Sequence, residues 1–274
     1  MKILMMEGNP IEVRKKAGSI NVRNATEIYT EAVRLFDKEI QIDIINGADG
    51  DKLPEGKYYS DYAGMIISGS SLRAFDDIPE VNSQIELLKE FAETGKPILG
   101  SCWGLQIAAI AAGGSVVASP KGREIGIARK IKMTRAGLNH PFMANKPAFF
   151  DAPCIHYDEI DVLPEKATLL CSNDHSQVQG AIIPVGNSEV WGVQYHPEFD
   201  IKQLRMLYQL YKKNLIEDGF VNDEKEHDNL IHQMQTLESN LSNKAISWLL
   251  NIDKDILDIN IRAAEIANWL KQLK

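Results

Sequence analysis

Apolar residues in the first part of the chain fall into short runs that alternate with longer amphipathic stretches. Buried strands are predicted for residues 2–6, 41–45, 62–68 and 96–100. Apolar side chains recur every three or four positions, the helical period, in residues 24–38, 79–94 and 104–112. In the first of these helices, Ile28, Ala32 and Leu35 form one stripe. Strands alternating with helices at this spacing predict a parallel sheet with helices on both faces.

The pattern changes after about residue 115. Shorter strands are predicted for residues 127–133, 168–172, 178–183 and 190–194. We interpret them as a small, partly antiparallel extension that carries one more core strand. A helix is expected over residues 200–216 and closes a first domain that spans residues 1–216. The fold class is therefore α/β.

Residues 217–274 differ from the rest in charge. They hold 6 Lys/Arg and 11 Asp/Glu, a net charge of −5, whereas the whole chain carries −8. The polar stretch 222–228 predicts a linker, and two or three helices are expected over 230–273, with Trp248 and Trp269 packed between them. Two apolar stripes support these helices, Leu230, Met234, Leu237, Leu241 and Ile259, Ala263, Ile266, Leu270, Leu273. This helical appendage is a candidate dimer surface, lid or dock for a partner protein.

Composition restricts the class of partner and the compartment. An acidic chain without a basic block argues against nucleic acid as a partner. No apolar run approaches the roughly 18 residues of a membrane span, and Glu7 comes too early for a signal peptide. Three cysteines do not make a disulfide framework, so a reduced cytoplasm fits best, with Cys154 and Cys171 in the core. The His and Cys spacings fit no metal site, and no cofactor is expected.

Cys102 is the strongest candidate for chemistry. It lies in Gly100-Ser101-Cys102-Trp103-Gly104, between an apolar strand and an Ala/Ile-rich helix. A turn of this kind presents a nucleophile above the sheet, and small flanking residues relieve crowding around it. The start of the helix also favours a thiolate. A lone cysteine is more often a core residue, but this context favours a nucleophile.

His196 and Glu198 supply the groups that such a thiol needs. His196 follows an apolar strand, and the proline between it and Glu198 fixes the turn. The carboxylate can bond one imidazole nitrogen and direct the other toward the thiol. Alone, this His-Pro-Glu sequence would indicate only a surface turn. Its pairing with the cysteine turn predicts acyl transfer by a Cys-His-Glu triad.

An oxyanion formed in that reaction needs backbone donors. Trp103 provides an N–H directly after Cys102, and the loop Ser68-Gly69-Ser70-Ser71 after a neighbouring strand is the candidate for a second. The other interpretation of this loop is an ordinary Gly/Ser turn.

Together, the sequences Gly-Ser-Cys-Trp-Gly-Leu-Gln and Gly-Val-Gln-Tyr-His-Pro-Glu-Phe resemble the class I, or triad, glutamine amidotransferases. The similarity is greater to the glutaminase domain of GMP synthase and its stand-alone relatives, and it covers roughly residues 60–200. Four intermediate motifs strengthen it: Ile67–Ser70, Arg123–Gly126, His156–Glu159 and Leu163-Pro164.

The resemblance implies a flavodoxin-like fold and hydrolysis of the glutamine side-chain amide. Cys102 would form a γ-glutamyl thioester, and ammonia would leave with a proton from His196. Ser70 and Trp103 would form the oxyanion hole. Gly69 and Gln106 would lie beside the bound glutamine. His156 and Asp158 are expected to be structural or to lie near the mouth of the site.

The sequence leaves the use of the ammonia open. It lacks the Ser-Gly-Gly-x-Asp-Ser loop of GMP synthase and a Gly-x-x-x-x-Gly-Lys phosphate loop. The leading hypothesis is therefore a stand-alone amidotransferase that supplies ammonia to an unknown acceptor, for which an ATP-dependent synthase on another chain is one candidate. The alternatives are a γ-glutamyl peptidase or hydrolase without a partner, and a non-catalytic binding protein. A homodimer through the C-terminal helices is a further expectation.

Overall fold

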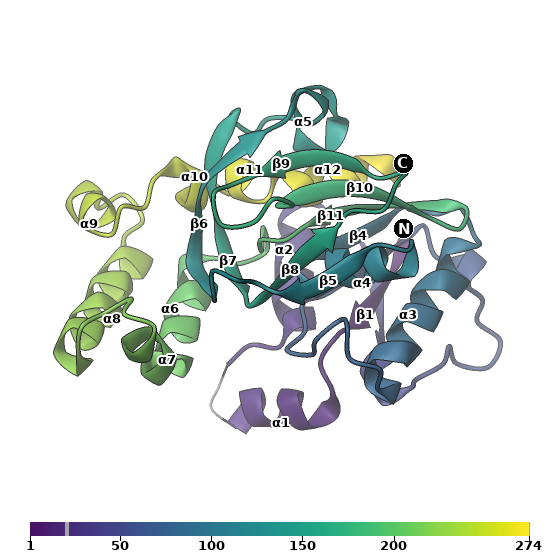
Figure 1. Ribbon diagram of the computed structural model, residues 1–274, viewed down its shortest axis with the longest axis horizontal. Coiled ribbons are helices and arrows are strands. Elements are labelled where there is room, and N and C mark those ends of the chain that lie inside the picture. The colour runs from purple at the N-terminus through teal and green to yellow at the C-terminus, as the bar shows by residue number, and fades with distance from the viewer. Residues whose placement is uncertain (20–21, 274) are drawn as a thin grey trace.

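The computed structural model, shown in Figure 1, describes residues 1–19 and 22–273. Its centre is a nine-stranded sheet in the order β2-β1-β3-β4-β11-β10-β9-β6-β7. These strands are β1 (Lys2–Glu7), β2 (Gln41–Asn46), β3 (Gly64–Ile67), β4 (Ile98–Ser101), β6 (Glu124–Met133), β7 (Phe149–His156), β9 (Thr168–Ser172), β10 (Gly180–Val185) and β11 (Ser188–Val193). A separate antiparallel pair joins β5 (Ser115–Ala118) and β8 (Asp158–Val162).

The large sheet has a parallel half and an antiparallel half. β2, β1, β3, β4 and β11 pair in parallel, whereas β10, β9, β6 and β7 extend the sheet from β11 as antiparallel neighbours. The predicted α/β class with an antiparallel extension is confirmed. β11 is the additional core strand expected before His196, because it pairs in parallel with β4.

Helices cover the sheet and connect its parallel strands (Figure 1). Their bounds are α1 (Ile11–Ser19), α2 (Ala25–Phe36), α3 (Pro79–Ala92), α4 (Trp103–Ala111), α5 (Arg135–Asn139), α6 (Ile201–Leu210) and α7 (Lys212–Glu217). Single 3-10 turns occur at Gly47–Asp49, Tyr59–Asp61 and Pro141–Met143.

Three of the expected helices agree with the structure, and one differs. α2, α3 and α4 lie where the periodicity predicts them, although Leu35 of the expected α2 stripe is 64% exposed. The single helix expected over 200–216 is wrong, since the chain forms α6 and α7 with a break at Tyr211. α1 was not expected; it buries none of its residues, so its sequence carries little apolar periodicity.

The C-terminal segment is more broken than its stripes predict. Its helices are α8 (Glu224–Ser239), α9 (Lys244–Leu249), α10 (Lys254–Leu257), α11 (Ile259–Arg262) and α12 (Ala264–Gln272). The linker interpretation of 222–228 is wrong for most of that stretch, because Asp223 caps α8 by accepting a hydrogen bond from the Glu226 N–H at 2.8 Å. Leu241 and Trp248 are exposed, so neither is the packing residue that was expected. Trp269 is fully buried, as expected.

α12 packs into the main core rather than beside it. Ile266 and Trp269 share an apolar cluster with Tyr29 of α2 and Ile3 of β1. Within this layer the Glu265 carboxylate accepts from the Tyr195 hydroxyl and lies 2.9 Å from Lys146 Nζ, in an ion pair with no exposed side-chain surface. A division of the chain into two domains at residue 216 stays a prediction. The packing of α12 in the main core argues that the C-terminal segment is not a separate folding unit.

The remaining expectations on the core agree with the structure. Cys154 and Cys171 are fully buried, and burial raises the pKa of both thiols. None of the helices in the described residues is long and apolar enough to cross a membrane.

Candidate active site

A pocket of about 630 Å³ lies where three neighbouring parallel strands end. Gly69 and Ser70 follow β3, Cys102 follows β4, and His196 follows β11; all four line the pocket. Ligands of open α/β sheets bind at this edge, outside the carboxyl ends of the strands. The fold therefore gathers residues that are far apart in sequence into one cavity.

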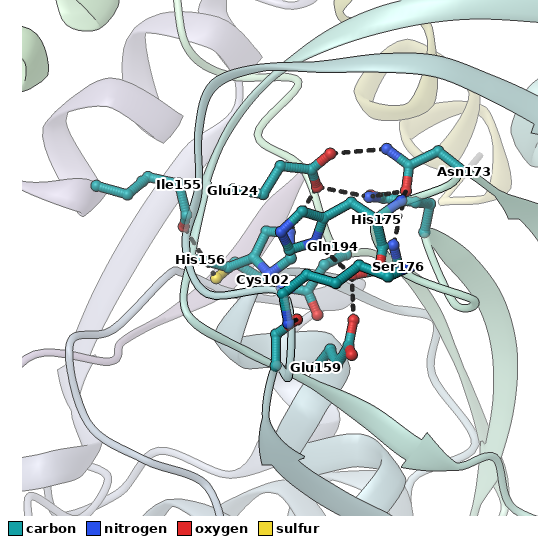
Figure 2. A network of polar contacts seen from close by, with 12 residues as sticks. Cys102, Glu124, Ile155, His156, Glu159, Asn173, His175, Ser176 and Gln194 are labelled. Atoms are coloured by element: carbon teal, nitrogen blue, oxygen red, sulfur yellow. Dashed lines mark hydrogen bonds and ion pairs between the residues drawn. The ribbon is translucent and has the colours of Figure 1, made fainter. Parts of the chain in front are cut away.

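Cys102 has a strained backbone at the mouth of a helix. Its φ of 50° and ψ of −97° are unusual for a residue with a side chain, and such strain is stored mainly at functional sites. Its N–H donates to the Val193 carbonyl at 2.8 Å, and its own carbonyl accepts from the Gln106 N–H at 3.1 Å, which opens α4. The thiol donates to the Ile155 carbonyl at 3.6 Å (Figure 2).

The two glycines that flank Cys102 are required by close packing. A Cβ on Gly100 would lie 2.7 Å from the Gly104 backbone, and a Cβ on Gly104 would lie 2.9 Å from the Ile67 carbonyl oxygen. α4 thus begins against the ends of β3 and β4. The expectation that small residues relieve crowding in this turn agrees with these contacts.

His196 and Glu198 form a buried pair. The His196 Nδ1 atom lies 2.6 Å from Glu198 Oε1, and both residues are about 5% exposed or less. Within the described part of the chain, Nε2 of His196 has no hydrogen-bond partner. A nitrogen held in this way is available to exchange a proton with a neighbouring group.

The environment of His196 favours its charged form. Burial lowers the pKa of His196, but the Glu198 carboxylate and the neighbouring Cys102 sulfur outweigh burial and raise it to about 10. The ring also stacks on Phe199, with centroids 4.0 Å apart and planes 4° apart. The stacking and the Glu198 contact together fix the orientation of the imidazole.

Two groups near Glu198 were not anticipated from the sequence. The Ser101 hydroxyl donates to Glu198 Oε1 at 3.3 Å. The phenol of Tyr29 is fully buried, and burial and the Glu198 charge raise its pKa well above its usual value. Tyr29 lies on α2, and no motif links that helix to the site, so only the tertiary structure reveals the proximity.

The loop after β3 is held by its own side chains. The Ser70 hydroxyl donates to the Gly8 carbonyl at 2.7 Å, and the Ser68 hydroxyl accepts from the Gly8 N–H at 2.9 Å. A Cβ on Gly69 would lie 2.9 Å from Cε1 of His196, so the loop packs directly on the imidazole. Gly69 therefore lies beside His196, while the roles expected of Gly69 and Ser70 stay predictions.

Trp103 does not line the pocket. Its indole is fully buried, and its Nε1–H donates to the Gln84 Oε1 atom at 2.8 Å. Gln84 in turn donates to the Gly8 carbonyl at 3.2 Å. The side chain of Trp103 thus braces the loop next to the site, and only its backbone is available for the predicted oxyanion role.

Gln106 lines the pocket one turn into α4. Its amide donates to the Asp158 carbonyl at 2.9 Å and to Gln194 Oε1 at 3.2 Å. The Asp158 carboxylate also lines the pocket, 3.5 Å from an Arg73 nitrogen. Burial raises the pKa of Asp158, and the Arg73 charge partly offsets this rise. Asp158 is thus at the site mouth, as one of the two expectations had it.

His156 belongs to a second polar cluster (Figure 2). Its Nε2 atom lies 2.8 Å from Glu124 Oε2 and its Nδ1 atom 3.1 Å from the Asp158 carbonyl. Glu124 also accepts from Asn173 at 2.7 Å and Gln179 at 2.8 Å. The partners of both His156 nitrogens are protein atoms, so His156 is a structural residue at the edge of the pocket.

Among the described residues, this cluster also contains the side chains close enough together to be considered as metal ligands. Ligand atoms of Glu124, His156 and His175 lie within 4.8 Å of one another. A metal would have to displace the contacts of Glu124 and His156 to protein groups, so the cluster is better described as a polar network. That the site needs no metal stays a prediction.

Comparison with known proteins gives the family. The family model described as "Glutamine amidotransferase class-I" matches residues 25–214. The chain belongs to this family. Among curated members, gamma-glutamyl-L-1-hydroxyisopropylamide hydrolase from Pseudomonas sp is 28% identical, and the match covers 100% of this chain and 93% of that protein.

Other class I amidotransferase relatives match less of the chain. Gamma-glutamyl peptidase 5 from Arabidopsis thaliana is 30% identical over 68% of this chain and 73% of its own length. GMP synthase from Thermomicrobium roseum is 31% identical, but the match covers 49% of this chain and 23% of the synthase. A glutamine amidotransferase structure from Thermotoga maritima has a TM-score of 0.61 at 20% identity, covering 94% of this chain and 98% of that one. That structure supports the fold, and the resemblance stated from the sequence motifs is confirmed.

Proposed function

We propose that this amidotransferase-family chain hydrolyses the amide bond of γ-glutamyl compounds, with Cys102 as nucleophile, His196 as acid and base, and Glu198 as the group that holds the imidazole. The observation that carries the proposal is the buried His196–Glu198 pair, whose second nitrogen is free, beside a strained Cys102 in one pocket. This arrangement has the parts of a nucleophile activated by an oriented base.

In the first step, His196 Nε2 takes the thiol proton and the sulfur bonds to the γ-carbonyl carbon. The backbone N–H groups of Ser70 and Trp103 stabilise the negative charge on the carbonyl oxygen. The C–N bond then breaks, and the leaving nitrogen takes a proton from His196. The proton that His196 took from the thiol is the one it supplies here, and the raised pKa of His196 favours the charged imidazole that carries it.

In the second step, water gives a proton to His196 and attacks the γ-glutamyl thioester. The C–S bond breaks, glutamate leaves, and the thiol regains its proton. Gly69 and Gln106 hold the glutamyl group during both steps. Gln106 suits this role because its amide is fixed by Asp158 and Gln194 and still lines the pocket.

Hydrolysis without a synthase is favoured over supply of ammonia to one. The relative that matches the whole chain carries the name of a γ-glutamyl amide hydrolase, whereas the match to GMP synthase covers about half of the chain. The pocket also extends from Cys102 to Leu207 of α6 and to Tyr211, which follows that helix. This length gives room for a leaving group larger than ammonia.

Glutamate release from the purified chain tests this function. Turnover of γ-glutamyl-L-1-hydroxyisopropylamide or of a γ-glutamyl dipeptide should exceed turnover of glutamine, and diazo-oxo-norleucine should alkylate Cys102. Cys171→Ser is the matched control, because Cys171 is a buried cysteine that does not line the pocket. Absence of both turnover and an adduct would favour the non-catalytic binding protein.

Ammonia supply remains the second candidate, because GMP synthases are among the relatives. In that case glutamine should be the best substrate, and a synthase should be captured with the chain from native extract. The exposed Trp248 and Leu249 on α9 are the surface we propose for such a partner or for a second copy of this chain. Size measurement of the free protein distinguishes the homodimer.

A further inference from the structure

Four arginines line the pocket, and they divide into two kinds. Arg14 donates to Asp49 at 2.7 Å, and Arg23 donates to Asp200 at 2.6 Å. These two charges are already neutralised by close carboxylates. Arg73 and Arg123 are different, because neither makes a hydrogen bond to a carboxylate within residues 1–19 and 22–273.

Arg123 is the less satisfied of this second kind. Its nearest carboxylate oxygen, on Asp218, is 3.9 Å away, and its buried Nε atom has no hydrogen-bond partner in the described chain. A guanidinium offers five donors in a planar fork that matches a carboxylate. The pocket thus contains a cation with unused donors.

Aromatic rings hold Arg123 in place. Its guanidinium carbon lies 5.8 Å from the centroid of Tyr157 and 5.2 Å from that of Tyr211, both of which line the pocket. Contacts of this kind stabilise a guanidinium through its face and leave the donors at its edge available. A side chain restrained in this way loses less entropy when it binds a ligand.

Arg73 and Arg123 both contact the ring of Tyr157, at 5.3 Å and 5.8 Å from its centroid, but their other partners differ. Arg73 lies 3.5 Å from Asp158, whose carbonyl accepts from Gln106, so it is coupled to the proposed glutamyl end. Arg123 instead contacts Tyr211 and Asp218, which follow α6 and α7. A carboxylate on the leaving group, rather than the one on the glutamyl group, is therefore the natural partner of Arg123.

We propose that Arg123 binds the carboxylate of an amino-acid leaving group, so that γ-glutamyl dipeptides are preferred over γ-glutamyl amides of neutral amines. This inference rests on the proposed hydrolase function and names its substrate class. A γ-glutamyl dipeptide brings two carboxylates, and the pocket offers two guanidiniums whose ion pairs, at 3.5 Å and 3.9 Å, are longer than those of Arg14 and Arg23. Arg123 is then the residue that determines specificity at the leaving-group end.

Two nearly isosteric substrates test the proposal. γ-Glutamyl-L-alanine and γ-glutamyl-L-1-hydroxyisopropylamide differ only in a carboxylate that replaces a hydroxymethyl group. The unaltered protein should show a kcat/KM about 10-fold to 100-fold higher for the dipeptide, the size expected of a hydrogen bond to a charged group. Arg123→Gln should bring this ratio close to one, mainly through KM for the dipeptide, and Arg123→Lys should retain an intermediate ratio.

Arg14→Gln is the matched control, because Arg14 lines the same pocket but is already paired, and it should keep the ratio. If the unaltered protein does not discriminate, or if Arg123→Gln lowers kcat/KM for both substrates equally, the assignment of Arg123 is overturned and the hydrolase function stands. If the unaltered protein releases glutamate from neither substrate, the proposed function itself fails, and the role of Arg123 fails with it.

Discussion

Two buried His–Glu pairs contribute imidazoles to the same pocket, and they differ in the second ring nitrogen. The closest N–O distance is 2.6 Å between His196 and Glu198 and 2.8 Å between His156 and Glu124. Nε2 of His196, the nitrogen that does not face Glu198, has no partner in the described residues. Nδ1 of His156, the nitrogen that does not face Glu124, lies 3.1 Å from the Asp158 carbonyl. A His–Glu contact alone therefore does not identify a reactive group.

The carboxylates show the same difference. Glu124 accepts a hydrogen bond from Asn173 through one oxygen and from Gln179 through the other. Both carboxylate oxygens therefore bind β6 to the loop after β9. Glu198 Oε2 has no such partner in the described chain. We infer that the first pair stabilises the fold, while the second is poised to exchange protons, and the following changes separate these roles.

Removal of the Cys102 thiol should have the largest effect on activity, because the thiol is the proposed nucleophile and His196 is the imidazole proposed to exchange its proton. Cys102→Ala should lower kcat for glutamate release by about 10⁴-fold or more, the loss typical of a removed nucleophile. The free energy of unfolding of this variant should change little or increase. The strained turn remains, and the group removed is one kept for reactivity and not for stability. Steady-state and single-turnover assays measure the first effect and urea unfolding the second. Retention of activity within 10-fold would remove Cys102 from the mechanism.

Breaking the proposed reactive pair should have the next largest effect. Glu198→Gln should lower kcat by about 10³-fold to 10⁴-fold, because the imidazole loses the charge that orients it. It should also move the alkaline limit of activity to lower pH. The Glu198 charge is what raises the pKa of His196 to about 10 against burial, so without it the proton for the leaving amine is lost earlier.

The matched control for that pH profile is Glu124→Gln, assayed at a temperature where the variant is folded. It should keep the alkaline limit where the unaltered protein has it. An equal downward shift in both variants would mean that the two pairs are not functionally distinct.

The sequence could predict that Cys102 and His196 lie in one pocket because the fold brings strand ends together. β3, β4 and β11 are parallel neighbours, so residues just after each of them must meet at one edge of the sheet. Apolar runs followed by Gly-x-Cys-x-Gly and His-Pro-Glu mark those ends in the sequence. The same reasoning located the Ser68–Ser71 loop.

The rest of the site depends on contacts that no local pattern records. α1 buries no residue, so its contribution to the pocket leaves no apolar signal. Arg123 begins a motif recognised by resemblance, yet its place between Tyr157 and Tyr211 follows from the packing of α6. Periodicity also does not say which side of a short helix is covered, which is why Trp248 was expected inside and lies 84% exposed.

Breaking the structural pair should affect stability more than activity. Glu124→Gln should lower the free energy of unfolding by about 3 kcal/mol, the size expected when buried hydrogen-bond donors lose a charged acceptor, because His156, Asn173 and Gln179 share Glu124. Urea unfolding measures it. Glu189→Gln, an exposed position on β11, is the control and should stay within about 0.5 kcal/mol. A change that small at Glu124 would contradict the structural role.

The smallest expected effect is a pH dependence of the stability difference between the unaltered protein and each variant. This difference should shrink at acid pH for Glu124→Gln and at alkaline pH for Glu198→Gln. Burial raises the pKa of Glu124, but its hydrogen bonds to His156, Asn173 and Gln179 outweigh this and hold the pKa below the ordinary value of 4.5. A carboxylate with a lowered pKa stabilises the fold above its unfolded value and loses this contribution as the pH falls. The stability gap between the unaltered protein and Glu124→Gln should therefore shrink below about pH 4.5.

For His196 the sign is reversed. Its raised pKa stabilises the fold below the ordinary value of 6.5, and this contribution is lost as the pH rises toward about 10. The stability gap between the unaltered protein and Glu198→Gln should accordingly shrink from neutral pH toward pH 10. Urea unfolding across this range checks both trends. If both gaps shrank on the acid side alone, Glu198 would act as a structural carboxylate like Glu124, and the contrast between the pairs would be lost.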